Sequence, residues 1–438
     1  SQTGLNFVPL EKSIESFPDI TVQVTVEQSG GLALPAITTG YCADSPLDLT
    51  RLEDAITTAS GVFTYTQEIE RLYIPDFLSG VVYVIDLNSN DTLTSIPVGS
   101  FPTGVAISPD KLTVYVTNRG SNTVSAIDVE SNTVVATIPV GAGPWGVEFS
   151  PDGSRAYVAN GQEDSLAIID VANESVIQKV AVGDSPWGVA VSPDGSKVLV
   201  TNRNSDNVSA IATADNSVVT IPVGDQPTGV AFNAVGNRAY VSNSGGEAIS
   251  VINTTTNMVT ETVATASGQY YLLVSPNGDV YSCHQNFEAI SRMEPDNANS
   301  VTVFSLEPGV FNSLSGLSIN EEASILYVVD QVQNKIIHFD TQGDTIANVI
   351  ALPEIGDVWG NFYVKASFTV ATPTAFSPDS GTVVQVAFDG GSGCTANTTI
   401  TFDGLQLPAS ITAQPASATV CPGESGTFRV SAQGTFLT

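Results

Sequence analysis

Positive charge is the scarcest property of this 438-residue sequence, which holds 14 Lys and Arg against 45 Asp and Glu, a formal net charge of −31. Such a surface repels nucleic-acid phosphates and anionic lipid, so we expect no nucleic-acid partner. The sequence also lacks the run of about 18 to 20 apolar residues that a membrane-spanning helix needs, so we expect no direct membrane insertion. Cations, basic proteins and neutral glycans are compatible with this charge.

Cysteine and histidine are also rare, with four and two residues in the whole chain. Four cysteines do not make a disulfide-dense scaffold, but they are consistent with an oxidising compartment. Few lysines and many Thr, Ser, Asn and Gly residues indicate an exported, extracellular protein. No signal peptide stands at Ser1, so we expect the sequence to begin after processing or inside a longer chain.

A repeated unit dominates the chain. Its best-marked position is a large residue in strings such as "VYVTN" and "AYVAN", and successive units are 42, 42, 42, 41, 41 and 46 residues apart. The seven positions are Tyr73, Tyr115, Tyr157, Leu199, Tyr240, Tyr281 and Tyr327. Each unit holds alternating runs of β-forming residues separated by turn residues, as in "SPDG". Four such strands fill about forty residues, one blade, so the repeat predicts an all-β, seven-bladed β-propeller.

The strings "VYVTN", "AYVAN", "VSAIDV", "IPVG" and "PWGV…SPDG" resemble the YVTN-type β-propeller repeats of bacterial and archaeal surface-layer-like proteins. The resemblance covers roughly Arg71 to Val364 and is weaker in the sixth and seventh units. The first unit lacks an inner strand, and "GDVWGNFYV" (356–364) supplies one after the last unit. We therefore expect the final strand to join the first blade, so that two open sheet edges pair.

The segments on either side of the repeats resemble Ig-like or PKD-like modules of Bacteroidetes cell-surface proteins, through "TGYCADSPLDLT" before them and "GCTANTTITF" after them. The resemblance implies a propeller inserted into an Ig-like sandwich, with Cys42 and Cys394 as its disulfide. Two unrelated flanking tails are the alternative. Cys421 has no partner in this sequence. The terminal strands either belong to neighbouring modules or complete the sandwich of another subunit.

These readings give a predicted domain organisation. Its parts are 1–30 as the end of a preceding module or a linker, 31–66 with 366–405 as the discontinuous Ig-like sandwich, 67–365 as the propeller, and 406–438 as the incomplete start of a second Ig-like module.

No constellation of residues indicates catalysis, so we expect no catalytic residue, bound cofactor or metal site. Ca²⁺ binding remains open without an identified site. His284 stands in a column otherwise held by Asn or Asp, which we expect to satisfy backbone groups at a strand end, with a functional rim as the alternative. Cys283 falls in a column of small residues and is expected to be a packed thiol rather than a nucleophile. The Asp column that includes Asp128 and Asp170 is expected to begin turns.

Three tryptophans are the best functional candidates. Trp145, Trp187 and Trp359 share one column of the inner strands, so they are expected at one mouth of the propeller channel. Aromatic rings there suit contact with a glycan or a peptide, although the rings could instead cap the channel by packing on each other.

The resulting hypothesis is an extracellular cell-surface protein that displays a β-propeller on Ig-like modules. Its role would be adhesion, or that of a structural subunit of a surface layer, sheath or filament, with a surface protein, a glycan or copies of itself as partner. A lactonase-like hydrolase and a periplasmic sensor are the alternatives, because propellers serve many functions.

Overall fold

The computed structural model describes residues 23–26, 63–87, 89–266, 268–285, 288–295, 300–306, 311, 313–352, 362–371, 383–389, 395–402, 411–414 and 427–433. The predictions for Cys42, Cys394, Cys421 and Trp359 lie outside these residues. The chain divides into two compact units, Glu70–Lys365 and the combination of Ser1–Ile69 with Ala366–Thr438.

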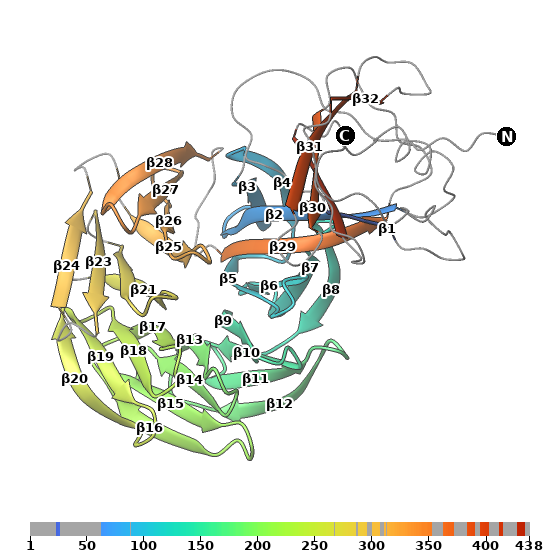
Figure 1. Cartoon of the computed structure of the whole chain (residues 1–438). Helices are drawn as coiled ribbons and strands as arrows, with labels where there is room; N and C mark the ends of the chain where they lie inside the picture. Colours follow the sequence, from blue (N-terminus) through green and yellow to red (C-terminus); the bar gives the residue numbers. More distant parts are fainter. Residues whose placement is uncertain are drawn as a thin grey trace. The chain divides into compact units, whose positions relative to one another are not determined.

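The unit Glu70–Lys365 is a seven-bladed β-propeller, as the repeat predicted. In blades 2 to 7 the strands of each antiparallel sheet follow one another from the central axis outward, and the innermost strands of successive blades surround this axis (Figure 1). In the described part of the chain all regular elements are β-strands. Blade 1 contains β29, β2, β3 and β4, and blades 2 to 7 contain β5 to β28 in consecutive groups of four.

The strands of the seven blades occupy four positions. The innermost strands are β29 (Phe362–Ala371), β5 (Pro102–Ile107), β9 (Pro144–Phe149), β13 (Pro186–Val191), β17 (Pro227–Phe232), β21 (Gln269–Val274) and β25 (Leu314–Ile319). The second strands are β2 (Phe63–Asp76), β6 (Thr113–Asn118), β10 (Arg155–Asn160), β14 (Lys197–Asn202), β18 (Arg238–Asn243), β22 (Val280–His284) and β26 (Ile325–Asp330). The third strands are β3 (Val81–Asp86), β7 (Thr123–Asp128), β11 (Ser165–Asp170), β15 (Asn207–Ala212), β19 (Ala248–Asn253), β23 (Ala289–Glu294) and β27 (Lys335–Asp340). The outermost strands are β4 (Asp91–Pro97), β8 (Thr133–Pro139), β12 (Ser175–Ala181), β16 (Val218–Pro222), β20 (Met258–Ala264), β24 (Ser300–Ser305) and β28 (Thr345–Ala351).

Burial along the strands follows from this arrangement. The second and third strands, such as β10 and β11, are buried along nearly their whole length because both faces of a blade pack against neighbouring blades. The outermost strand β8 instead alternates between exposed and covered residues. A typical blade interface contains Tyr115 and Phe149, whose ring centroids are 4.5 Å apart. Full burial of a large apolar side chain stabilises the folded protein by roughly 1.5–3 kcal/mol. Because these side chains are buried between blades, each blade depends on its neighbours for stability.

The recurring glycine of the inner strands lets successive blades approach the channel axis. A Cβ atom on Gly104 would lie 2.2 Å from the carbonyl oxygen of Trp145, and one on Gly146 would lie 2.5 Å from that of Trp187. Real Cβ atoms essentially never come closer than 3.0 Å to such an atom. The inner strands can therefore pack at this distance only where the side chain is absent.

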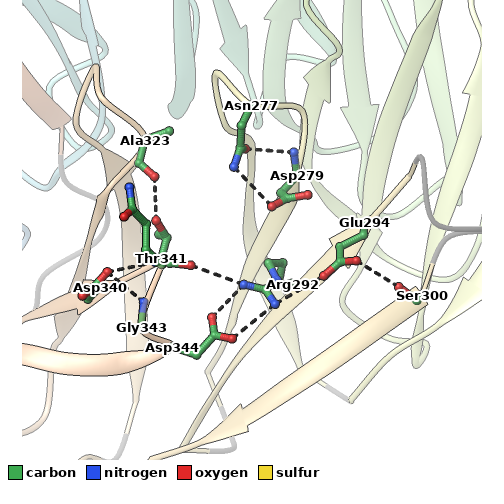
Figure 2. Close-up of polar contacts among 11 residues, drawn as sticks. Asn277, Asp279, Arg292, Glu294, Ser300, Ala323, Asp340, Thr341, Gly343 and Asp344 are labelled. Atoms are coloured by element: carbon green, nitrogen blue, oxygen red, sulfur yellow. Dashed lines mark hydrogen bonds and ion pairs between the residues drawn. The ribbon is translucent and has the colours of Figure 1, made fainter.

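Basic side chains also join neighbouring blades at several turns. Arg292 on β23 reaches the turn before β28, where its Nη1 lies 2.7 Å from Asp344 Oδ1 and its Nη2 lies 3.3 Å from Asp344 Oδ2 (Figure 2). Its Nη2 also lies 3.3 Å from Glu294 Oε1. Lys197 of blade 4 makes the corresponding contact with blade 5, where it donates to the carbonyl of Thr254 and to Asn257.

The ring closes through the strand that follows the last repeat. β29 pairs with β2, so the first blade takes its innermost strand from the end of the propeller sequence, as predicted, although the described strand begins at Phe362 and overlaps the predicted 356–364 only at its end. Tyr363 stacks on Tyr327 of blade 7 with ring centroids 5.5 Å apart. Lys365 Nζ lies 3.1 Å from Glu70 Oε1 and 3.2 Å from Glu322 Oε1, and hydrogen bonds to these carboxylates raise the pKa of Lys365.

The other unit contributes five described strands. β1 (Gln23–Val26) pairs antiparallel with the beginning of β2, with Gln23 opposite Thr66 and Val26 opposite Phe63. β30 (Val383–Asp389), β31 (Thr395–Phe402), β32 (Ile411–Gln414) and β33 (Thr427–Gln433) form a separate antiparallel sheet in the order β32-β31-β30-β33.

Candidate ligand site at the channel mouth

Each blade brings the start of its innermost strand beside the end of its second strand. In blade 3, Pro144 is paired with Asn160, and the backbone N–H of Gly161 donates to the carbonyl of Gly143. The same pairing recurs in the other complete repeats, for example between Arg119 N–H and the carbonyl of Phe101. We call this end of the channel the channel mouth. Residues that precede the inner strands and residues that follow the second strands therefore meet there.

The Asn column at this end is structural, as predicted. The Asn118 side chain accepts from the backbone N–H of Gly99 at 3.0 Å and donates to the hydroxyl of Ser125 at 2.9 Å. Asn160 and Asn243 accept from the equivalent glycines, Gly141 and Gly224. The Asp column also begins turns as predicted, since Asp128 accepts from the backbone N–H of Ser131 and Asp170 from that of Asn173.

Trp145 and Trp187 stack on each other at the channel mouth. Their ring centroids are 3.7 Å apart with an interplanar angle of 20°, and both side chains are half-buried. Gly161 makes room for this pair, because a Cβ atom there would lie 2.7 Å from Cδ1 of Trp145.

Two arginines complete the stack. The guanidinium carbon of Arg119 lies 4.9 Å from the ring centroid of Trp145, and that of Arg203 lies 5.3 Å from the centroid of Trp187. Because the inner faces of the indoles contact each other, the guanidinium groups must cover the outer faces. The order across the mouth is therefore Arg119, Trp145, Trp187, Arg203. Each cation–π contact contributes about 0.5–2 kcal/mol.

Aromatic and amide side chains extend both ends of this stack. Arg203 Nη2 donates to Gln226 Oε1 at 2.9 Å and lies 3.5 Å from the hydroxyl of Tyr270. The ring of Tyr270 meets the ring of Trp187 edge-on. Beside Arg119, Phe101 stacks on Phe77 with centroids 4.8 Å apart and remains 42% exposed. We call the residues Phe101, Arg119, Trp145, Trp187, Arg203 and Tyr270 the mouth strip.

The charge of the mouth strip contrasts with that of the whole chain. Lys111, Lys179, Arg292 and Lys365 each form an ion pair with a carboxylate. Among the residues that the structure describes, neither Arg119 nor Arg203 does, although acidic residues outnumber basic ones by 45 to 14. The strip thus places two arginines that have no carboxylate partner among the described residues in a protein with a net charge of −31, on loops that also carry Asp184 and Asp225.

The cysteine and the two histidines in the described part of the chain are buried or stand on other strands than the mouth strip. Cys283 is completely buried, its Sγ lies 3.7 Å from the carbonyl oxygen of Leu314, and burial raises the pKa of its thiol to about 12. It is therefore a packed thiol, as predicted. His284 is buried with Nε2 2.7 Å from the hydroxyl of Ser291. Burial lowers the pKa of His338, on the third strand of blade 7, to about 4.

One ionisable residue of the inner strands was not singled out from the sequence. Glu148 on β9 stands where the other described inner strands carry Ala, Leu or Ser, and it is half-buried. Burial raises the pKa of Glu148 to about 7, while a 3.2 Å hydrogen bond from the backbone N–H of Phe149 acts in the opposite direction.

The sequence placed Trp145 and Trp187 in one column but missed their arginine partners. A signal was present, since "TNR" ends the second strand in both blade 2 and blade 4. Its meaning depends on which side chains stand next to it, in the neighbouring blade for Arg119 and in the same blade for Arg203. In the described ranges, no group of three or more His, Cys, Asp or Glu side chains could hold a metal ion. None of the described residues forms a helix that could span a membrane.

Comparison with known protein families supports the propeller fold. Residues 79–195 match the model of a family described as YNCE-like beta-propeller. Together with the seven blades, this match defines the protein as a β-propeller and confirms the propeller part of the resemblance noted in the sequence. No curated protein sequence matches the chain.

Three solved structures share the architecture. Hydrazine synthase of Kuenenia stuttgartiensis is 16% identical with a TM-score of 0.54, over 72% of this chain and 95% of that chain. A functionally unknown protein from Desulfotomaculum acetoxidans DSM 771 is 17% identical with a TM-score of 0.58, over 67% and 98%. Dihydro-heme d1 dehydrogenase NirN in complex with DHE is 14% identical with a TM-score of 0.50, over 66% and 74%. At these identities the likenesses show the fold alone.

Proposed function

We propose that this protein is an extracellular, cell-surface binding protein that holds its ligand at the channel mouth of the propeller. The mouth strip carries this proposal, because it gathers aromatic rings and two arginines, without carboxylate partners among the described residues, where the inner strands begin. Convergent polar groups among aromatic side chains are typical of binding sites. Acid–base chemistry would require an accessible histidine or carboxylate at the reacting atoms. His284 ends β22 at the mouth but is buried with Nε2 2.7 Å from the hydroxyl of Ser291, and His338 lies on the third strand of blade 7.

The proposal includes display of the propeller on Ig-like modules, with the propeller inserted into one of them. The grouping of Ser1–Ile69 with Ala366–Thr438 as one unit supports this arrangement. Peptide mapping under non-reducing conditions is expected to find Cys42 linked to Cys394. Isolation of both cysteines as free thiols would remove the support for the insertion.

Binding at the mouth is tested with an array of neutral glycans, acidic glycans and surface proteins. We expect the protein to bind at least one of them, and the double substitution Trp145→Ala with Trp187→Ala to abolish that binding. Leu93→Ala is the control, because it removes an apolar side chain of the outermost strand β4 that is 48% exposed. Unchanged binding by the tryptophan variant would contradict a site at the mouth.

Electron microscopy of the same material separates binding from assembly. Monodisperse single particles are the expected result for a binding head. An ordered filament or lattice would instead identify a structural subunit of a surface layer, sheath or filament, and ring opening of lactones by the protein would favour the hydrolase.

A further inference from the structure

We propose that the mouth strip recognises the carboxylate of an acidic sugar at the end of an otherwise neutral glycan, with Arg119 and Arg203 as the donors. This inference rests on the proposed function, because it names the ligand chemistry of the same site.

The first argument is that the indole faces are already occupied. Trp145 and Trp187 lie 3.7 Å apart, and each outer face carries a guanidinium group. A neutral sugar therefore has no indole face on which to stack. The indole faces, in contrast, cannot accept strong hydrogen bonds from the guanidinium N–H groups that lie over them. A planar guanidinium matches the geometry of a carboxylate, to which it donates two parallel hydrogen bonds.

The second argument is the missing counter-charge. In the described part of the chain, the Arg119 side chain has no hydrogen bond or ion pair, and the Arg203 side chain donates to neutral groups, Gln226 and Tyr270. Nε of both arginines is buried without a hydrogen-bond partner. A carboxylate ligand would supply the opposite charge that both arginines lack.

The net charge of −31 limits how much negative charge the ligand can carry. At physiological ionic strength the Debye length is about 8 Å, so the two arginines dominate the field for a group that touches them. A polyanion would extend beyond this distance and be repelled by the acidic surface. A single terminal carboxylate is attracted without this penalty.

The neighbours of the arginines favour a sugar over a peptide. Phe101 offers an exposed aromatic face beside Arg119, which suits the apolar side of a sugar ring, and Gln226 and Tyr270 offer hydrogen-bonding groups for hydroxyls. An extended peptide would bind best along a free strand edge, whereas strand ends are gathered at the mouth.

The test uses two oligosaccharides that differ only at C6 of the terminal residue, one ending in glucuronate and the other in glucose. Isothermal titration calorimetry is expected to show about tenfold or tighter binding of the glucuronate probe. The double variant Arg119→Gln with Arg203→Gln should lose this preference, and Arg119→Lys should lose part of it because the bidentate contact is gone. Arg238→Gln, which removes an exposed arginine at the opposite end of a second strand, should keep it. Thermal unfolding of each variant confirms that the propeller is folded.

Each other outcome overturns the inference in a distinguishable way. Equal affinity for the two probes, lost in Trp145→Ala with Trp187→Ala, would exclude carboxylate recognition but leave the proposed function standing. Tighter binding of a neutral peptide with a free C-terminal carboxylate would exclude a sugar. A glucuronate preference that survives both the arginine and the tryptophan substitutions would place the site elsewhere and contradict both proposals. No binding of the glucuronate probe at millimolar concentration would reject the inference alone, because the array tests the mouth independently.

Discussion

The hydroxyl of Thr117 in blade 2 donates a 2.5 Å hydrogen bond to the backbone carbonyl of Trp145 in blade 3. The same hydroxyl accepts a 2.8 Å hydrogen bond from the backbone N–H of Gly104 in its own blade. Thr201 repeats the arrangement between blades 4 and 5, where it donates to the carbonyl of Thr228. Blade 3 carries Ala159 at this position, so no hydroxyl joins it to blade 4. These bonds fix the inner-strand backbone at Trp145 and Thr228, but not at Trp187.

Removing this hydroxyl from blade 2 should therefore lower the stability of the protein, and adding one at the same position of blade 3 should raise it. Thr117→Val leaves a half-buried carbonyl and N–H without this partner and is expected to lower the free energy of unfolding by about 1–2 kcal/mol. Ala159→Ser should raise it by about 1 kcal/mol, because it restores the bond between blades 3 and 4. Urea unfolding followed by intrinsic fluorescence measures both. A destabilising Ala159→Ser would show that the site has no room for the oxygen.

The inner-strand glycine should be intolerant of any side chain. Gly146→Ala brings a Cβ within 2.5 Å of the carbonyl oxygen of Trp187, so we expect a loss of at least about 2 kcal/mol from displaced backbone. Gly246→Ala is the matched control, since its nearest neighbouring atom would be 3.8 Å away. The control should change stability by less than about 0.5 kcal/mol. Equal thermal midpoints for the two variants would refute close packing of the inner strands.

Glu148 should make stability fall as the pH rises from about 4.5 to 7. Burial raises the pKa of this carboxyl in the folded state to about 7, so the native protein holds a proton there that the unfolded chain releases. Its stabilising contribution is complete below the unfolded pKa and is lost as the pH passes through the folded value. Glu148→Gln is therefore expected to be more stable than the natural protein by on the order of 2–3 kcal/mol at pH 8 and equal to it at pH 4.

The control for this comparison is Glu130→Gln, which changes an exposed turn residue of blade 2. Chemical unfolding at pH 4, 6 and 8 should show no such pH-dependent gain for the control. A Glu148→Gln effect of the same size at all three pH values would show that packing, rather than ionisation, distinguishes the two side chains.

Cys283 should be inert in the native protein. Its side chain is fully buried and burial raises its pKa to about 12, so almost no thiolate exists at neutral pH. Iodoacetamide at pH 8 is expected to label Cys283 only after addition of denaturant, with the modified peptide identified by mass spectrometry. Rapid labelling under native conditions would mean that blade 6 opens locally.

The tryptophan column shows which contacts the sequence repeat predicts and which it does not. The spacing of the units assigned Trp145 and Trp187 to the same strand position, and the structure brings their rings into contact. Arg119 and Arg203 stand one residue after the Asn column, which looked purely structural. Arg119 reaches Trp145 across the interface between blades 2 and 3, whereas Arg203 reaches Trp187 between two strands of blade 4, and the periodicity of the unit reports neither contact.

Glu148 illustrates a second limit. In the sequence it is one glutamate among 45 acidic residues, in a unit that otherwise follows the repeat closely. Its raised pKa arises from the protein that surrounds it on an innermost strand, and desolvation is a property of the assembled ring.

The sequence by itself determined the all-β class, the seven blades and the closure of the ring, because strand alternation, turn residues and a near-constant period are local patterns that only one repeat architecture satisfies. It also determined that the Asn and Asp columns serve turns and strand ends. Only the tertiary structure decided which side chains of separate strands and blades meet: the stacked indoles, the arginines on their outer faces and the threonine hydroxyl bonds from second strands to the next blade. Those contacts depend on distances between strands and blades, which are set by packing after the chain has folded.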